Sequence, residues 1–125
     1  MSENEISKWI IGAAIEVHKL MGPGLLESVY QQCLARELQL RDIPYTSEYT
    51  LNAEYKGLKF DIDYRADLLV ADRVVVELKV VEEILPVHQA QLLSYLRLSG
   101  KKLGLLINFN VDVLKNGIKR IANQL

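Results

Sequence analysis

Two segments near the start of the chain carry apolar side chains at helical spacing. The first follows a capping box, Ser2-x-x-Glu5, and should end at Gly22-Pro23-Gly24, because proline and glycine interrupt helices. Its apolar positions are Ile6, Ile10, Ala13, Val17 and Leu20. The second should run from about Leu25 to Arg41, before Pro44. Its expected inward positions are Leu26, Val29, Cys33 and Leu38, and Trp9 is also expected in the core.

The following residues change to the pattern of β-strands. Expected strands are Tyr45 to Ala53, Leu58 to Val70 and Val74 to Val81, with a tight reversal at Asp72-Arg73. Pro86 should open a helix from about Val87 to Ser99, and Gly100 should close it. Leu103 to Phe109 then fits a buried strand. The tail fits either a helix or a turn at Asn116-Gly117 followed by a short strand, and we favour the strand.

This order of elements predicts an α/β (α+β) fold. Three strands joined by short turns should form an antiparallel meander. The helix after the meander is long enough for a crossover connection, so the next strand can run parallel to the third. We therefore expect a mixed central sheet flanked by helices.

Composition narrows the class of protein. The 125 residues, half of them hydrophobic and a quarter charged, predict one globular domain spanning 1–125. The single cysteine excludes a disulfide framework, and no apolar run is long enough for a membrane span. The acidic start of the sequence does not resemble a signal peptide, so the expected location is the cytoplasm, with no membrane partner.

Charge is unevenly distributed along the chain although the net charge is only −1. Residues 1–96 carry 9 basic and 15 acidic side chains, whereas residues 97–125 carry 6 basic and 1 acidic. The small net charge argues against strong non-specific binding to nucleic acid. The asymmetry fits either an acidic metal site beside a basic edge that faces phosphate, or ordinary surface scatter.

The most informative residues lie around the reversal between the second and third strands. Glu77 and Lys79 share one face of the third strand and interrupt its apolar pattern, and Asp67 on the preceding strand can lie across from them. Charged groups inside a sheet are costly unless they are paired or bind a metal. Two carboxylates beside a lysine could hold a divalent cation. The same spacing also fits a partly buried ion-pair network, and the residues alone leave the two open.

Asp67 with Glu77-Leu78-Lys79 resembles the PD-(D/E)xK nuclease superfamily, and Gly24 to Tyr30 matches the GxxExxY motif of a small family usually placed within it. Ala66 stands where the superfamily pattern has proline. The resemblance implies a restriction-endonuclease-like core in which Asp67, Glu77 and the carbonyl of Leu78 bind Mg²⁺ or Mn²⁺. It also implies that Lys79 positions the attacking water and that Glu27 is an additional acidic residue near the metal.

Further candidates surround this set. Gln91 and Tyr95 resemble the QxxxY motif of RecB-like nucleases and share one helix face, where they could contact phosphate or water. His88 could join them. Tyr30 lies on the same side of its helix as Glu27, as a substrate contact or a core aromatic. Lys101 and Lys102 are the basic pair expected to contact nucleic acid.

The function expected from this pattern is a Mg²⁺- or Mn²⁺-dependent nuclease that acts on DNA, which we favour, or on RNA. The rival interpretation is a nucleic-acid-binding or regulatory module that keeps the nuclease fold without useful turnover. The small size favours a weak binder that needs a homodimer or a protein partner.

Overall fold

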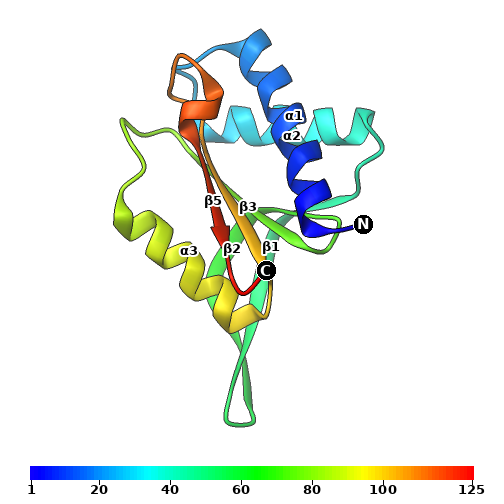
Figure 1. Cartoon of the computed structure of the whole chain (residues 1–125), viewed down its shortest axis with the longest axis vertical. Helices are drawn as coiled ribbons and strands as arrows, with labels where there is room; N and C mark the ends of the chain where they lie inside the picture. The colour runs from blue at the N-terminus through cyan, green and yellow to red at the C-terminus, as the bar shows by residue number, and fades with distance from the viewer.

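A computed structural model describes residues 1–125 and shows three helices and a five-stranded sheet (Figure 1). In chain order the elements are α1 (Glu3–Met21), α2 (Glu27–Leu40), β1 (Tyr45–Tyr55), β2 (Leu58–Val70), β3 (Val74–Lys79), α3 (Pro86–Ser99), β4 (Leu103–Asn108), a 3₁₀ turn (Leu114–Gly117) and β5 (Ile118–Ala122). The predicted order is confirmed. The tail forms the favoured strand, with the 3₁₀ turn in front of it.

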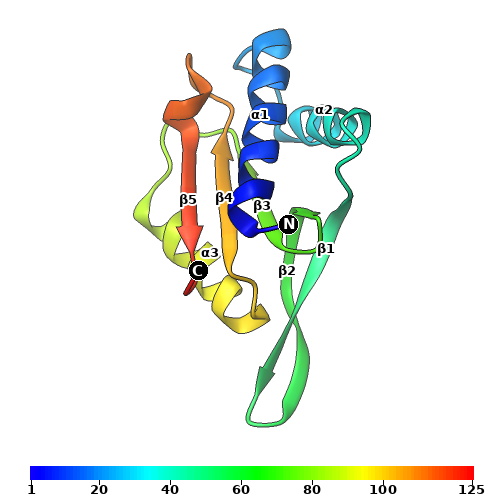
Figure 2. The ribbon, with the colours of Figure 1, turned by 45° about the vertical axis from the view of Figure 1, so that its right-hand side comes forward.

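The sheet has the strand order β1-β2-β3-β4-β5. Strands β1, β2 and β3 form the predicted antiparallel meander, α3 crosses over so that β4 runs parallel to β3, and β5 returns antiparallel to β4. The mixed sheet and its flanking helices confirm the α+β fold class. The β1–β2 hairpin projects beyond the rest of the molecule (Figures 1 and 2).

Helices cover both faces of the sheet, with α1 and α2 on one face and α3 on the other (Figure 2). The sequence of β3 causes this arrangement, because strand side chains alternate between faces. Val74, Val76 and Leu78 pack in the core under α1 and α2, whereas Val75 packs under α3. Glu77 shares the α3 face with Val75. None of the helices is both long enough and apolar enough to span a membrane.

The buried face of α2 differs from the predicted one. Its buried residues are Tyr30, Leu34 and Leu38, one helical turn apart, so of the expected inward positions only Leu38 is buried. The helix begins at Glu27, and Leu26 precedes it with a 73% exposed side chain. Cys33 is half-buried at the margin of the core. Trp9 is 37% exposed, so its expected place in the core is wrong.

Candidate metal centre

The alternation of side chains along the hairpin breaks next to Asp67. Ala66 packs under α3, yet Leu68, two residues later, packs under α1 and α2. A regular strand would place both on the same face. On β1 the corresponding break lies at Glu48, between the pairs Ser47–Leu68 and Tyr49–Ala66, and Glu48 has a φ of 52°. The break places Asp67 where it can reach groups on both faces of the sheet.

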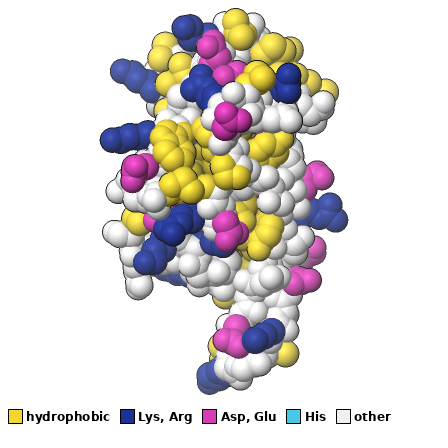
Figure 3. Space-filling model, turned by 90° about the vertical axis from the view of Figure 1, so that its right-hand side faces the viewer, with side chains coloured by type: hydrophobic (Ala, Val, Ile, Leu, Met, Phe, Trp, Pro, Cys, Tyr) yellow, Lys and Arg dark blue, Asp and Glu magenta, His cyan; other side chains and the backbone are white.

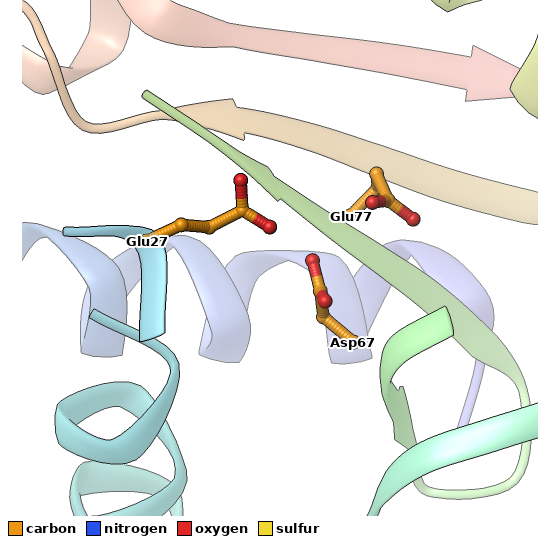
Figure 4. A group of neighbouring side chains, drawn as sticks. All are labelled: Glu27, Asp67 and Glu77. Carbon is orange, nitrogen blue, oxygen red and sulfur yellow. The ribbon is translucent and has the colours of Figure 1, made fainter. Parts of the chain in front are cut away.

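Three carboxylates meet at this point. One oxygen each from Glu27, Asp67 and Glu77 lies within 4.8 Å of the other two. In Figure 4 the carboxyl groups of Glu27 and Asp67 point toward one another, with Glu77 beside them on β3. Glu27 is exposed, and the other two are half-buried. The structure therefore brings together acidic residues from α2, β2 and β3, and we name these three residues the carboxylate cluster.

Backbone contacts fix Asp67 in this position. The β2–β3 pairing ends at Leu68 and Val76, so the backbone N–H of Leu78 has no ladder partner on β2. It donates instead to Oδ2 of Asp67 at 2.7 Å. From α2, Nε2 of Gln31 donates to the backbone carbonyl of Asp67 at 3.3 Å. These bonds tie the kinked residue to both β3 and α2.

The cluster has the electrostatics of a cation site. Burial is the largest cause of the raised pKa of each of the three carboxyl groups, and the pKa of Glu77 reaches about 7 with all causes combined. The charge of Asp67 is the second cause of the raised pKa values of Glu27 and Glu77. Lys79 acts in the opposite direction and lowers the pKa of all three. Carboxylates that are partly buried and close together repel one another, and a cation placed between them stabilises their charged form.

Several other expected residues line a small pocket of about 30 Å³ beside Glu77 and Lys79. The pocket is lined on the α3 side by His88, Gln91 and Tyr95. Nε2 of Gln91 donates to the hydroxyl of Tyr95 at 3.2 Å, which confirms that the two share a face. Nδ1 of His88 accepts from the backbone N–H of Leu85 at 3.0 Å and so caps the start of α3.

Tyr30 is not a substrate contact, because its side chain is fully buried. Its ring stacks on Phe109 with centroids 4.4 Å apart. Its hydroxyl donates to the carbonyl of Gly22 and accepts from the N–H of Leu25. Tyr30 therefore anchors the α1–α2 loop. Glu27 lies one turn earlier on α2, so the packing of Tyr30 also fixes the position of Glu27.

The basic pair is also remote from the cluster. Lys101 and Lys102 precede β4, whose first residue pairs with Val74, whereas Glu77 lies three residues further along β3. That separation is about 10 Å along the strand. The ammonium of Lys101 donates to the carbonyl of Asp72 in the β2–β3 turn at 3.1 Å. The structure therefore does not bring this pair to the carboxylates.

Sequence reasoning missed Tyr64 on β2, which donates a hydrogen bond from its hydroxyl to Oε2 of Glu77. Its ring stacks on Tyr95 with centroids 3.9 Å apart. Simple alternation places Tyr64 and Asp67 on opposite faces, so no periodic signal links Tyr64 to the cluster. Sequence reasoning also missed Glu48. Burial is the largest cause of the raised pKa of Asp67, and the charge of Glu48 raises it as well.

Comparison with known proteins agrees with this geometry. The model of the PD-(D/E)XK nuclease superfamily matches residues 4–121. Among solved structures, that of SSO0001 is similar in fold, with a TM-score of 0.54 and 17% sequence identity over 96% of this chain and 78% of that chain. No curated protein matches the chain significantly. Because the family model covers nearly all of the sequence, the chain belongs to the PD-(D/E)XK nuclease superfamily.

Proposed function

We propose that the chain is a divalent-metal-dependent phosphodiesterase that hydrolyses nucleic acid. The observation that carries this proposal is the carboxylate cluster beside Lys79 in a chain of a nuclease superfamily. A buried ion-pair network would also place charges in the sheet, but it would pair them one to one. Three carboxylates that face a single lysine leave an excess of negative charge, which a cation balances.

The donor atoms of the cluster fit a hard divalent ion. Carboxylate and carbonyl oxygens are the ligands that Mg²⁺ and Mn²⁺ prefer in proteins. We assign Asp67, Glu77 and the carbonyl of Leu78 as ligands, with Glu27 as an additional acidic ligand. When bound, such an ion lowers the pKa of a water molecule and offsets negative charge on the scissile phosphate.

The remaining residues of the site position the reactants. An ammonium group offers three N–H donors, so Lys79 can orient a water oxygen and a phosphate oxygen together. Gln91 is exposed at the mouth of the pocket, where its amide can reach the phosphate. His88 and Tyr95 are further candidate contacts on α3. In hydrolysis the water oxygen bonds to phosphorus while the bond from phosphorus to the 3′ oxygen breaks.

The motifs support a finer placement within the superfamily. Residues 24–30, Gly-Leu-Leu-Glu-Ser-Val-Tyr, fit the GxxExxY pattern, and its glutamate and tyrosine make different contacts. Glu27 belongs to the carboxylate cluster, whereas Tyr30 anchors the loop that precedes it. The Gln91–Tyr95 hydrogen bond likewise fits the QxxxY pattern. We propose membership of the GxxExxY family on these grounds.

We keep DNA, in preference to RNA, as the proposed substrate, and the charge of the molecule bears on how strongly the chain binds it. One face of the molecule shows charges of both signs interspersed with hydrophobic groups, and the tip of the hairpin also carries both (Figure 3). With a net charge of −1, the chain has little general attraction for polyphosphate. This balance supports weak binding by the chain alone and a contribution from a second copy or a protein partner.

A cleavage screen tests the proposal. Labelled single- and double-stranded DNA and RNA are incubated with the protein in Mg²⁺, Mn²⁺ or EDTA. We expect cleavage in the presence of metal and none in EDTA. Asp67→Asn should abolish cleavage, whereas Asp61→Asn, a matched change at an exposed position of the hairpin, should leave it intact. If the wild-type protein binds these nucleic acids but cleaves none of them in Mg²⁺ or Mn²⁺, the result would favour the nucleic-acid-binding module instead.

A further inference from the structure

Tyr64 occupies a place in the site that no sequence motif assigns. It lies on β2 within the hairpin, half-buried, and its ring lines the same pocket as Lys79 and Gln91. Its hydroxyl donates to Oε2 of Glu77. The carboxyl group of Glu77 is thereby held by another side chain. Asp67, by comparison, is held by the backbone N–H of Leu78.

The hydroxyl of Tyr64 is itself held in place. The ring stacks on that of Tyr95 with an interplanar angle of 21°. Tyr95 belongs to α3 and accepts a hydrogen bond from Gln91, one turn earlier on the same helix. A continuous set of contacts therefore runs from α3 through Tyr95 and Tyr64 to Glu77. Such contacts connect the helix on one face of the sheet to a carboxylate of the cluster.

A carboxylate needs this kind of support to bind a metal in one geometry. The terminal torsion of a glutamate side chain is broad, so an unsupported carboxyl group samples many orientations. A hydrogen bond to one oxygen fixes the plane of the group and leaves the other oxygen available. Groups that hold metal ligands in this way typically change metal affinity by about 10- to 100-fold.

We propose that Tyr64 is a positioning residue: it fixes Oε2 of Glu77 through its hydroxyl so that the other carboxylate oxygen faces a divalent cation. This inference rests on the proposed function, because it takes Glu77 as a metal ligand. Tyr95 acts indirectly, because its stacked ring fixes the plane of the Tyr64 ring, and Gln91 holds Tyr95 by a hydrogen bond. The QxxxY pair thereby acts on the metal ligand through Tyr64, in addition to any contact with phosphate.

Calorimetric titration of the full chain with Mn²⁺ tests this role without relying on turnover. Tyr64→Phe keeps the stacked ring and removes only the hydroxyl. We expect it to weaken Mn²⁺ binding about 10-fold or more, while the thermal denaturation midpoint of the metal-free protein changes little. Tyr49→Phe is the matched control, because Tyr49 packs against the same cluster of apolar residues from β1. It should leave the Mn²⁺ dissociation constant unchanged.

The possible results separate the two proposals. Wild-type protein that binds Mn²⁺, together with a Tyr64→Phe variant of equal affinity, would overturn the role of Tyr64 and leave the metal site standing. Wild-type protein that binds no Mn²⁺ would overturn the proposed function and this inference with it. If circular dichroism shows that Tyr64→Phe is unfolded, Tyr95→Leu replaces it. Removal of the stacked ring should then also weaken Mn²⁺ binding, and unchanged affinity would overturn the proposal.

Discussion

At the scale of single residues, Asp67 shows how an irregular strand creates a site. It lies where β2 changes the face that it presents, so its carboxylate reaches Glu27 on the α2 side and its Oδ2 accepts from Leu78 of β3. Asp67, Glu77 and Lys79 could be predicted from their order and spacing. Tyr64 and Glu48 could not, because their approach depends on a break in alternation that the sequence does not reveal.

The metal-free protein should lose stability as the pH rises toward neutrality. Burial and the charge of Asp67 raise the pKa of Glu77 from 4.5 to about 7, so between these values the folded protein binds a proton that the unfolded chain releases. The contribution of Glu77 to the free energy of unfolding is therefore largest below about pH 4.5 and falls by up to about 3 kcal/mol as the pH approaches 7. Urea denaturation in EDTA measures this slope. Glu77→Gln should flatten it, and a wild-type stability that rises over this range would contradict the assignment.

Divalent metal should reverse that loss. A metal ion that binds the folded protein and not the unfolded chain raises the free energy of unfolding. The increase is about 2.7 kcal/mol at a metal concentration 100 times the dissociation constant. Thermal denaturation with and without Mn²⁺ measures the effect. Asp67→Asn should remove the metal-dependent shift, because an amide cannot supply the lost negative charge. An equal shift in Asp67→Asn and wild-type protein would place the metal elsewhere.

At the scale of elements, the packing of α2 determines where Glu27 lies. The order and type of the elements could be predicted because the spacing of hydrophobic residues and the positions of Pro and Gly indicate the same elements along most of the chain. The buried face of α2 could not, since Leu26 and Val29 also repeat at helical spacing. The stacking of Tyr30 on Phe109, a contact between distant segments, selects the face that includes Tyr30.

Tyr30 should therefore contribute to stability and not directly to chemistry. Tyr30→Phe removes the hydroxyl that bonds Gly22 and Leu25, which should cost about 1–2 kcal/mol of unfolding free energy. Tyr30→Ala also leaves a cavity and should cost about 3–5 kcal/mol. Urea denaturation provides both values. Tyr55→Phe, at a 62% exposed position of the hairpin, should change stability by less than about 0.5 kcal/mol.

At the scale of the whole molecule, the two faces of the sheet contribute different parts of the site. Glu27 comes from α2 on one face, and Gln91 and Tyr95 come from α3 on the other. Asp67 and Glu77 lie between them in the sheet. Of the basic C-terminal residues, Lys101 lies away from this site, since it contacts the β2–β3 turn. The charge asymmetry fitted either a basic edge or surface scatter, and the fold places the pair Lys101 and Lys102 away from the carboxylates.

The central claim is that the carboxylate cluster and Lys79 form one hydrolytic site, and single-turnover cleavage by Lys79→Ala tests it most directly. Lysine is not a metal ligand, so the variant should bind Mn²⁺ as wild type does while cleavage slows by about 10²- to 10⁴-fold. Lys8→Ala, which changes an exposed lysine of α1, should cleave at the wild-type rate. Equal rates for Lys79→Ala and wild type at saturating Mn²⁺ would contradict the claim.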